Sequence, residues 1–248
     1  MISKKVLLDV ISKYSLGGLV TQVKWSIRDK KLDIVFGGNT AGYKGKVEYD
    51  GDFTLKEGDY AIWSSDQLVK NISILNEDIL IDAPRKNNIP THINLADTNY
   101  EISFTLSDPA NFESSPPKVV ERPKPNASFD ISDEFIVRYI KSTDVLASRG
   151  ANLFSIKSAE GFTGSELVFN TQVGETSINF AIEADVQQEI KEYYFNSDLI
   201  RAILKANKNY QNGTFNLYIR DSHTLLIMLE FECEGIKTQY QINNTINS

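Results

Sequence analysis

Residues 132–140 read Ser132-Asp133-Glu134-Phe135-Ile136-Val137-Arg138-Tyr139-Ile140, and this pattern occurs four times in the chain. Each copy begins with a serine and carries apolar residues three and seven positions later. A serine N-cap followed by apolar residues one turn apart predicts a short amphipathic helix. The four predicted helices lie at 3–14, 65–75, 132–149 and 197–208, and the serines are Ser3, Ser65, Ser132 and Ser197. One supersecondary unit used four times constrains a fold more than any single motif does.

The repeat also holds at twice this spacing. The first predicted helix matches the third at an offset of 129 residues, and the second matches the fourth at an offset of 132. The chain therefore divides into two similar halves, each with two helix-containing units.

Between the helices hydrophobicity alternates with period two, which predicts β-strands. The predicted strands lie at 20–27, 32–36, 45–49, 60–63, 79–82, 91–95, 100–106, 153–158, 165–169, 177–183, 193–195, 214–219, 225–231 and 237–242. Tight turns are predicted at Asp29-Lys30, Asn212-Gly213 and Glu234-Gly235. Four short helices among mostly antiparallel strands indicate the α+β class, with each half built as a doubled β-α-β-β-β unit.

Five of the seven prolines fall between residues 109 and 128. Proline cannot donate to a strand ladder and stiffens the chain into an extended form. We therefore predict an N-terminal domain at 1–108, an interdomain connector at 109–128 and a C-terminal domain at 129–248.

The composition excludes several classes of protein. The 248 residues are 41% hydrophobic, but no apolar run approaches the roughly 20 residues of a membrane-spanning helix. No apolar signal segment opens the chain, so we expect it in the cytoplasm, with no membrane partner. The single cysteine, Cys233, excludes an internal disulfide. The two histidines lack neighbouring ligands and no nucleophile lies near a base, so we expect no metal site, no cofactor and no catalytic residue.

The charge is distributed unevenly. The formal net charge is −7, yet the four helical stretches together carry a net of +4 and the remaining chain carries −11. Most acids in the helices lie in a first turn, where the helix dipole accounts for them. Basic faces on regular helices can meet phosphates without reading sequence, although an ordinary solvated face would look the same. The candidate phosphate-facing residues are Lys5, Lys13, Lys70, Arg138, Lys141, Arg149, Arg201, Lys205 and Lys208.

This organisation resembles the DNA sliding clamps, and within them the polymerase processivity factors of T-even-type bacteriophages. Local similarity is clearest at 60–68 through 74–78 and at 131–135 through Arg149. The closing strand at 237–242 is similar to the last strand of clamps such as proliferating cell nuclear antigen. The chain departs from the phage pattern in its longer connector and in beginning directly at its first helix, which leaves the usual opening strand short or missing.

The resemblance implies a ring with helices inside and sheets outside, formed as a homotrimer around duplex DNA. It implies that the strand at 100–106 of one chain pairs with the strand at 177–183 of the next. The interface residues would be Tyr100, Ile102, Phe104, Ile178, Phe180 and Ile182. It also implies a DNA polymerase and a clamp loader as partners, which would bind a peptide pocket near the connector. The matching pocket positions are Val119, Val120, Tyr240 and Ile242.

Two alternatives stay open on the sequence alone. A viral structural or assembly protein built from two β-rich domains would explain the repeat, but it would leave the basic helix faces without a role. A hydrolase would need a carboxylate or histidine site, and none is found in the sequence.

Overall fold

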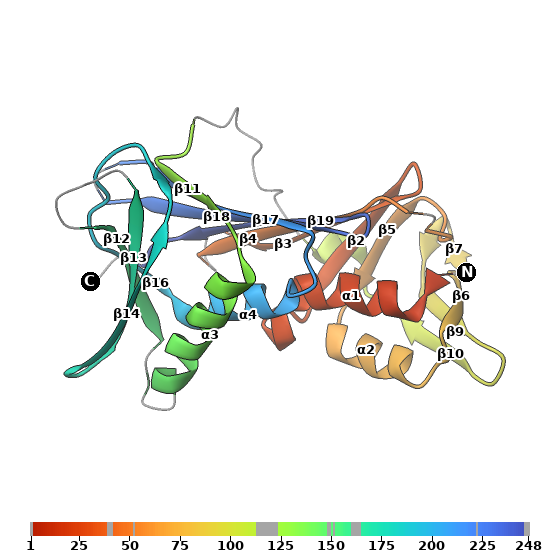
Figure 1. Cartoon of the computed structure of the whole chain (residues 1–248). Coiled ribbons are helices and arrows are strands. Elements are labelled where there is room, and N and C mark those ends of the chain that lie inside the picture. The colour runs from red at the N-terminus through yellow and green to blue at the C-terminus, as the bar shows by residue number, and fades with distance from the viewer. Residues whose placement is uncertain are drawn as a thin grey trace. The chain divides into compact units, whose positions relative to one another are not determined.

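The computed structural model describes residues 2–38, 42–51, 53–112, 124–147, 150, 152–159, 165–221 and 223–245. These residues fall into two compact units (Figure 1). Unit 1 takes its residues from the ranges Met1–Gly38, Lys44–Lys118 and Glu234–Thr238. Unit 2 takes its residues from Asn39–Tyr43, Val119–Cys233 and Gln239–Ser248.

Unit 1 contains two α-helices, α1 and α2, which contact each other (Figure 1). Its helices are α1 (Lys4–Ser15), η1 (Leu16–Gly18), α2 (Ser65–Ser73) and η2 (Pro109–Asn111). Its strands are β1 (Ile2–Ser3), β2 (Val23–Arg28), β3 (Lys31–Gly38), β4 (Tyr43–Tyr49), β5 (Gly58–Ile62), β6 (Asp78–Asp82), β7 (Arg85–Lys86), β8 (Ile89–Pro90), β9 (His92–Ala96) and β10 (Glu101–Thr105). They are arranged in the orders β1-β6-β9-β10 and β4-β3-β2-β5, beside the small β7-β8 hairpin.

Unit 2 repeats this plan, with α3 (Asp133–Ala147) and α4 (Ser197–Ala206) in contact with each other. Its strands are β11 (Ala127–Asp130), β12 (Leu153–Ser158), β13 (Glu166–Val173), β14 (Thr176–Glu183), β15 (Asp185–Val186), β16 (Tyr193–Asn196), β17 (Asn212–Ile219), β18 (Leu225–Cys233) and, from residue 239 on, β19 (Ile236–Asn243). They follow the orders β14-β13-β12-β16 and β15-β11-β17-β18-β19. Strands pair antiparallel in both units, as in β2-β3, β9-β10, β12-β13, β13-β14 and β17-β18, which agrees with the alternating pattern.

The four helices begin at or one residue after the predicted serines, but only one of these serines caps its helix as expected. The Ser132 hydroxyl accepts from the Phe135 backbone N–H at 3.1 Å. In α2 and α4 the cap is the residue before the serine, namely Ser64 and Asn196. The capping role predicted for Ser65 and Ser197 is therefore wrong, since both are buried first residues of their helices.

The backbone tests the predicted tight turns and the predicted opening strand. Asp29 and Lys30 both have positive φ, and so do Glu234 and Gly235, as a two-residue hairpin turn requires. Asn212-Gly213 is not a turn, because these residues open β17 and pair with β18. The opening strand β1 has only two residues, which confirms the expectation of a short first strand.

The predicted connector at 109–128 is described only in part, because residues 113–123 lie outside the described ranges. At its start the Asp108 carboxylate accepts from the Ala110 N–H at 2.9 Å and caps η2. At its end, residues 127 and 128 already belong to β11 and pair with β17.

The core of unit 2 is an aromatic cluster centred on α3. Phe135 is fully buried, and its ring lies between 5.0 and 6.3 Å from five other rings, measured between centroids. Those rings belong to Phe129, Tyr139, Phe169, Phe180 and Phe215. One helix residue thus holds strands of both sheets of the unit together.

We expect Phe135→Ala to lower the free energy of unfolding of unit 2 by about 3–5 kcal/mol, because it removes a large buried side chain and leaves a cavity. Urea unfolding followed by fluorescence and circular dichroism measures this loss. Val137→Ala, on the same helix at a site that is 48% exposed, is the matched control and should change stability by less than about 0.5 kcal/mol. Equal effects of the two substitutions would contradict the assigned core.

Candidate functional site

The helices of unit 1 hold three of the sequence-predicted cations in three different environments. Lys5 is exposed and lies 3.4 Å from a Glu234 carboxylate oxygen. Lys70 is exposed near the end of α2, with no ion pair among the described residues. Lys13 is only 1% exposed and lies 3.0 Å from Asp9.

The prediction that Lys13 points outward is wrong. Lys13 follows Val10 by three residues and therefore lies on the same side of the helix as the buried stripe. Its long aliphatic stem can be buried while Asp9 compensates the ammonium charge. We leave Lys13 out of any DNA-facing surface.

A lysine that the sequence analysis did not single out has a structural role in unit 1. The Lys4 ammonium donates to the Ser73 carbonyl at 2.9 Å and to the Leu75 carbonyl at 2.6 Å. These carbonyls stand at the C-terminal end of α2, where a cation is favourable to the helix dipole. Lys4 thus ties α1 to α2.

In unit 2, Arg138 and Lys141 lie on α3, Arg201 and Lys205 lie on α4, and carboxylates accompany three of these four cations. Arg138 pairs with Glu134 one turn earlier. Arg201 lies between Asp144 at 2.8 Å and Asp198 at 2.6 Å. Lys205 lies 3.7 Å from Asp144.

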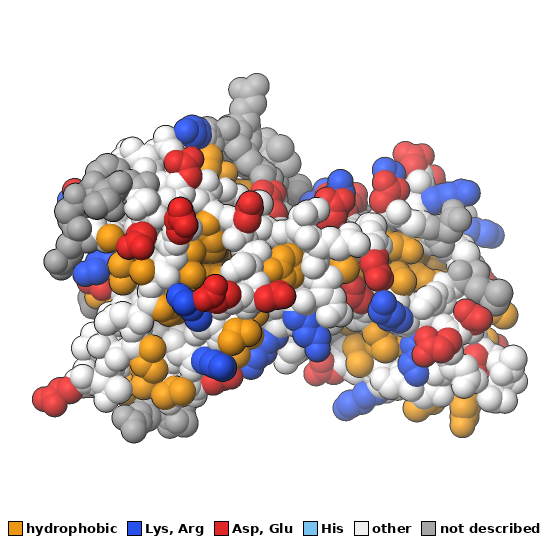
Figure 2. Space-filling model, viewed as in Figure 1, with side chains coloured by type: hydrophobic (Ala, Val, Ile, Leu, Met, Phe, Trp, Pro, Cys, Tyr) orange, Lys and Arg blue, Asp and Glu red, His pale blue; other side chains and the backbone are white. Residues whose placement is uncertain are grey.

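The unit 2 cations Lys141 and Lys208 are exposed with no ion pair among the described residues, and Arg149 lies outside those residues. Figure 2 shows lysine and arginine side chains over the helices of each unit, with acidic side chains beside them. The helix faces are therefore mixed in charge rather than uniformly basic. Such faces can bind phosphates only weakly and in a salt-dependent way.

The two strands predicted to join subunits are both edge strands of their sheets. β10 ends the sheet of β1, β6 and β9, and β14 ends the sheet of β13, β12 and β16. Ile178, Phe180 and Ile182 are half-buried and alternate along one face of β14. On the β10 side, Tyr100 is 52% exposed and Ile102 is half-buried.

Phe104 differs from the other predicted interface residues, because it is buried within its own chain. Its ring stacks on Trp63, with centroids 5.8 Å apart and an interplanar angle of 8°. Trp63 itself is 45% exposed, and its indole N–H donates to the Thr105 carbonyl at 2.8 Å. Trp63 is the functional candidate that the sequence analysis missed, although it closes the predicted strand at 60–63.

The predicted peptide pocket is not formed by the residues that the structure describes. Tyr240 and Ile242 are each 1% exposed, and Tyr240 accepts a hydrogen bond from the Asn207 amide at 2.9 Å. Both occupy the inward positions of β19, so assigning them to a surface pocket is wrong. Val119 and Val120 lie outside the described residues.

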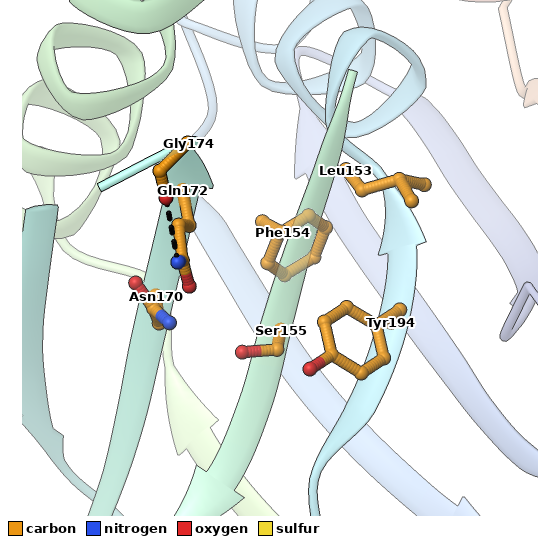
Figure 3. A pocket seen from close by; sticks show the side chains of 7 residues that line it. All are labelled: Leu153, Phe154, Ser155, Asn170, Gln172, Gly174 and Tyr194. Carbon is orange, nitrogen blue, oxygen red and sulfur yellow. Dashed lines mark hydrogen bonds between the residues drawn. The ribbon is translucent and has the colours of Figure 1, made fainter. Parts of the chain in front are cut away.

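Unit 2 contains a hollow of about 350 Å³ on the sheet of β12, β13 and β16 (Figure 3). It is lined by Leu153, Phe154, Ser155, Asn170, Gln172, Gly174 and Tyr194. The Ser155 hydroxyl donates to Glu192 at 2.7 Å, and the Gln172 amide donates to the Gly174 carbonyl at 2.9 Å. Partial burial and the neighbouring Glu192 raise the pKa of Tyr194. The lining residues combine apolar side chains with uncharged hydroxyl and amide groups, and these polar groups are suited to hydrogen bonding.

The described residues contain no group of three or more histidine, cysteine, aspartate or glutamate side chains placed to hold a metal ion. Among these same residues, no helix is both long and apolar enough to span a membrane.

Comparison with known proteins identifies the fold. No protein-family model matches the chain, and a search among curated proteins found no match either. The solved structures that match include two that are similar over almost the whole chain. The structure of the C-terminal region of FEN-1 bound to A. fulgidus PCNA has a TM-score of 0.72 at 14% identity, covering 100% of this chain and 98% of that chain.

The second structure, proliferating cellular nuclear antigen from Entamoeba histolytica, has a TM-score of 0.68 at 14% identity. It covers 98% of this chain and 94% of that chain. At this level of identity the likeness is one of fold. The chain has the α+β fold of the PCNA sliding clamps along its full length, as the resemblance in its sequence implied.

Proposed function

We propose that this protein is a sliding clamp, a ring that encircles duplex DNA and tethers a DNA polymerase during replication. The observation that carries the proposal is the match of the entire chain to clamps of the PCNA fold, without large insertions or omissions. Cations on the exposed faces of helices in both units support it, since such residues meet phosphates without reading bases.

The proposed ring is a homotrimer. Two units in each chain give six units in three copies, and a head-to-tail contact between unlike edges closes such a ring. The edges proposed to meet are β10 of one chain and β14 of the next, because each ends its sheet and carries apolar side chains. Pairing them would satisfy backbone groups that otherwise invite uncontrolled association. Trp63, beside β10, would add a partly exposed aromatic anchor to this contact.

The proposed DNA contact combines two kinds of cation. Lys70, Lys141 and Lys208 are exposed and have no ion pair among the described residues. Arg201 and Lys205 share carboxylates with their own chain, and so do Lys5 and Arg138. Contacts of this strength would let the ring slide, and retention would come from encirclement rather than from affinity.

The proposed protein partners are a DNA polymerase and a clamp loader. The A. fulgidus clamp was solved with the C-terminal region of FEN-1 bound to it, and we propose that this chain likewise takes up partner segments. Val119 and Val120 stay candidate contacts, whereas Tyr240 and Ile242 are omitted because they are buried. The bacteriophage source and the cytoplasmic location stay predictions.

Light scattering on the purified protein should give about three times the chain mass of 27.9 kDa. Ile178→Glu should shift the mass to that of a monomer, because it places a charge on the half-buried face of edge strand β14. Leu80→Glu, on the inner strand β6 at a site that is 56% exposed, is the control and should stay trimeric. A monomeric wild type or a large open assembly would contradict the ring, and the latter would favour a structural protein.

Reversing the charge at Lys141, Arg201 and Lys205 together should weaken binding to a short labelled duplex and leave the trimer intact. The slope of log affinity against log salt should fall by about 0.9 for each phosphate that the variant no longer neutralises. Fluorescence anisotropy across a salt series measures both quantities. The control reverses Lys56, Lys86 and Lys191, which are exposed and lie outside the helices, and it should change little. Equal binding by both triple variants would remove the DNA assignment from α3 and α4.

A further inference from the structure

Asp144 stands at an unfavourable place for an acidic residue. It lies in the last turn of α3, and that turn contains no basic residue. The C-terminal end of a helix carries partial negative charge, so an acid there is destabilising unless something compensates it. The helix itself therefore does not explain Asp144, whereas Asp198 stands in the first turn of α4, where the dipole favours an acid.

The compensation comes from α4. Arg201 and Lys205 are four residues apart and lie on one face of α4, and both approach the same Asp144 oxygen, at 2.8 and 3.7 Å. Arg201 contacts Asp144 through Nη1, and its Nη2 pairs with Asp198 at 2.6 Å. The four side chains carry two positive and two negative charges, so this cluster is neutral as a whole.

In this cluster the Asp144 carboxylate takes the place that a phosphate would occupy beside the two cations. A carboxylate bound by an arginine and a nearby lysine uses the donors that would otherwise bind a DNA phosphate. Asp144 is 48% exposed, Lys205 is 53% exposed and Arg201 is 21% exposed, so solvent reaches all three side chains and an external anion can compete with the carboxylate.

We propose that Asp144 sets the strength of the DNA contact by competing with phosphate for Arg201 and Lys205. This inference rests on the proposed clamp function and concerns its proposed DNA-facing surface. Asp144 acts through the two cations and does not touch DNA itself. A phosphate that binds there must first displace the carboxylate, which keeps each contact short-lived and favours sliding.

A different role for Asp144 makes the opposite prediction. If Asp144 only holds Arg201 in the orientation that phosphate needs, then its removal lets the guanidinium move and weakens DNA binding. The sign of the change in affinity therefore separates competition from positioning.

The test uses Asp144→Asn in the full-length protein, with a short labelled duplex titrated by fluorescence anisotropy over a salt series. Competition predicts an affinity about two- to tenfold higher near 0.1 M salt, and a salt slope steeper by about 0.9 for each further phosphate that is neutralised. Glu175→Gln also removes one exposed negative charge, from the turn between β13 and β14, and should leave affinity nearly unchanged. The thermal unfolding temperature of Asp144→Asn is recorded as the structural control.

A second variant links the effect to the two cations. In a background of Arg201→Gln and Lys205→Gln, adding Asp144→Asn should no longer raise the affinity, because no freed cation remains. A rise that persists in this background would overturn the assignment, as would an unchanged or lower affinity of Asp144→Asn alone. If the wild-type trimer does not bind the duplex at all, the proposed function fails and this inference fails with it.

Discussion

The fold depends on the burial of one apolar stripe of each helix against the sheets of its own unit. In α1, Leu7, Val10 and Ile11 are fully buried, and in α4 the same holds for Ile200 and Ile203. Each such side chain contributes on the order of 1.5–3 kcal/mol, so no helix can rotate about its axis without losing several of them. The residues left on the outer faces are therefore set by packing. Burial of the apolar stripe therefore places these residues on the outer faces whether or not DNA is bound.

This constraint also explains how much the sequence could predict. Apolar spacing is a local signal, so the four helices begin within one residue of their predicted starts and the α+β class is correct. Turn chemistry is local too, as the positive φ angles at Asp29-Lys30 show. Asn212-Gly213 has the same local signal and fails, because cross-strand pairing with β18 extends the strand through it. The serine caps of α2 and α4 fail by one residue, because Ser64 and Asn196 accept the capping hydrogen bonds while Ser65 and Ser197 are buried in the first turn.

The individual site residues were harder to predict, because their environments depend on segments distant in sequence. Asp144 and Arg201 are 57 positions apart, and nothing in either helix alone indicates that they pair. Tyr240 is correctly placed in a strand, but the face it occupies depends on Asn207 and Phe231 from neighbouring elements. Trp63 stays partly exposed because Phe104 fills the space beneath it. In each case the sequence indicated the helix or strand that contains the residue, but it did not predict the contact that the residue makes.

The two contacts of the proposed clamp differ in how they respond to salt. A contact between β10 and β14 would rest on backbone hydrogen bonds and apolar side chains, which screening by ions affects little. A contact between helix cations and phosphates is electrostatic, and it weakens steeply as salt rises. A ring closed by the first kind can stay on DNA even when the second kind is weak. This division accounts for a net charge of −7 on a protein proposed to hold DNA: encirclement removes the need for a strongly basic surface, and acids such as Asp144 can remain among the cations.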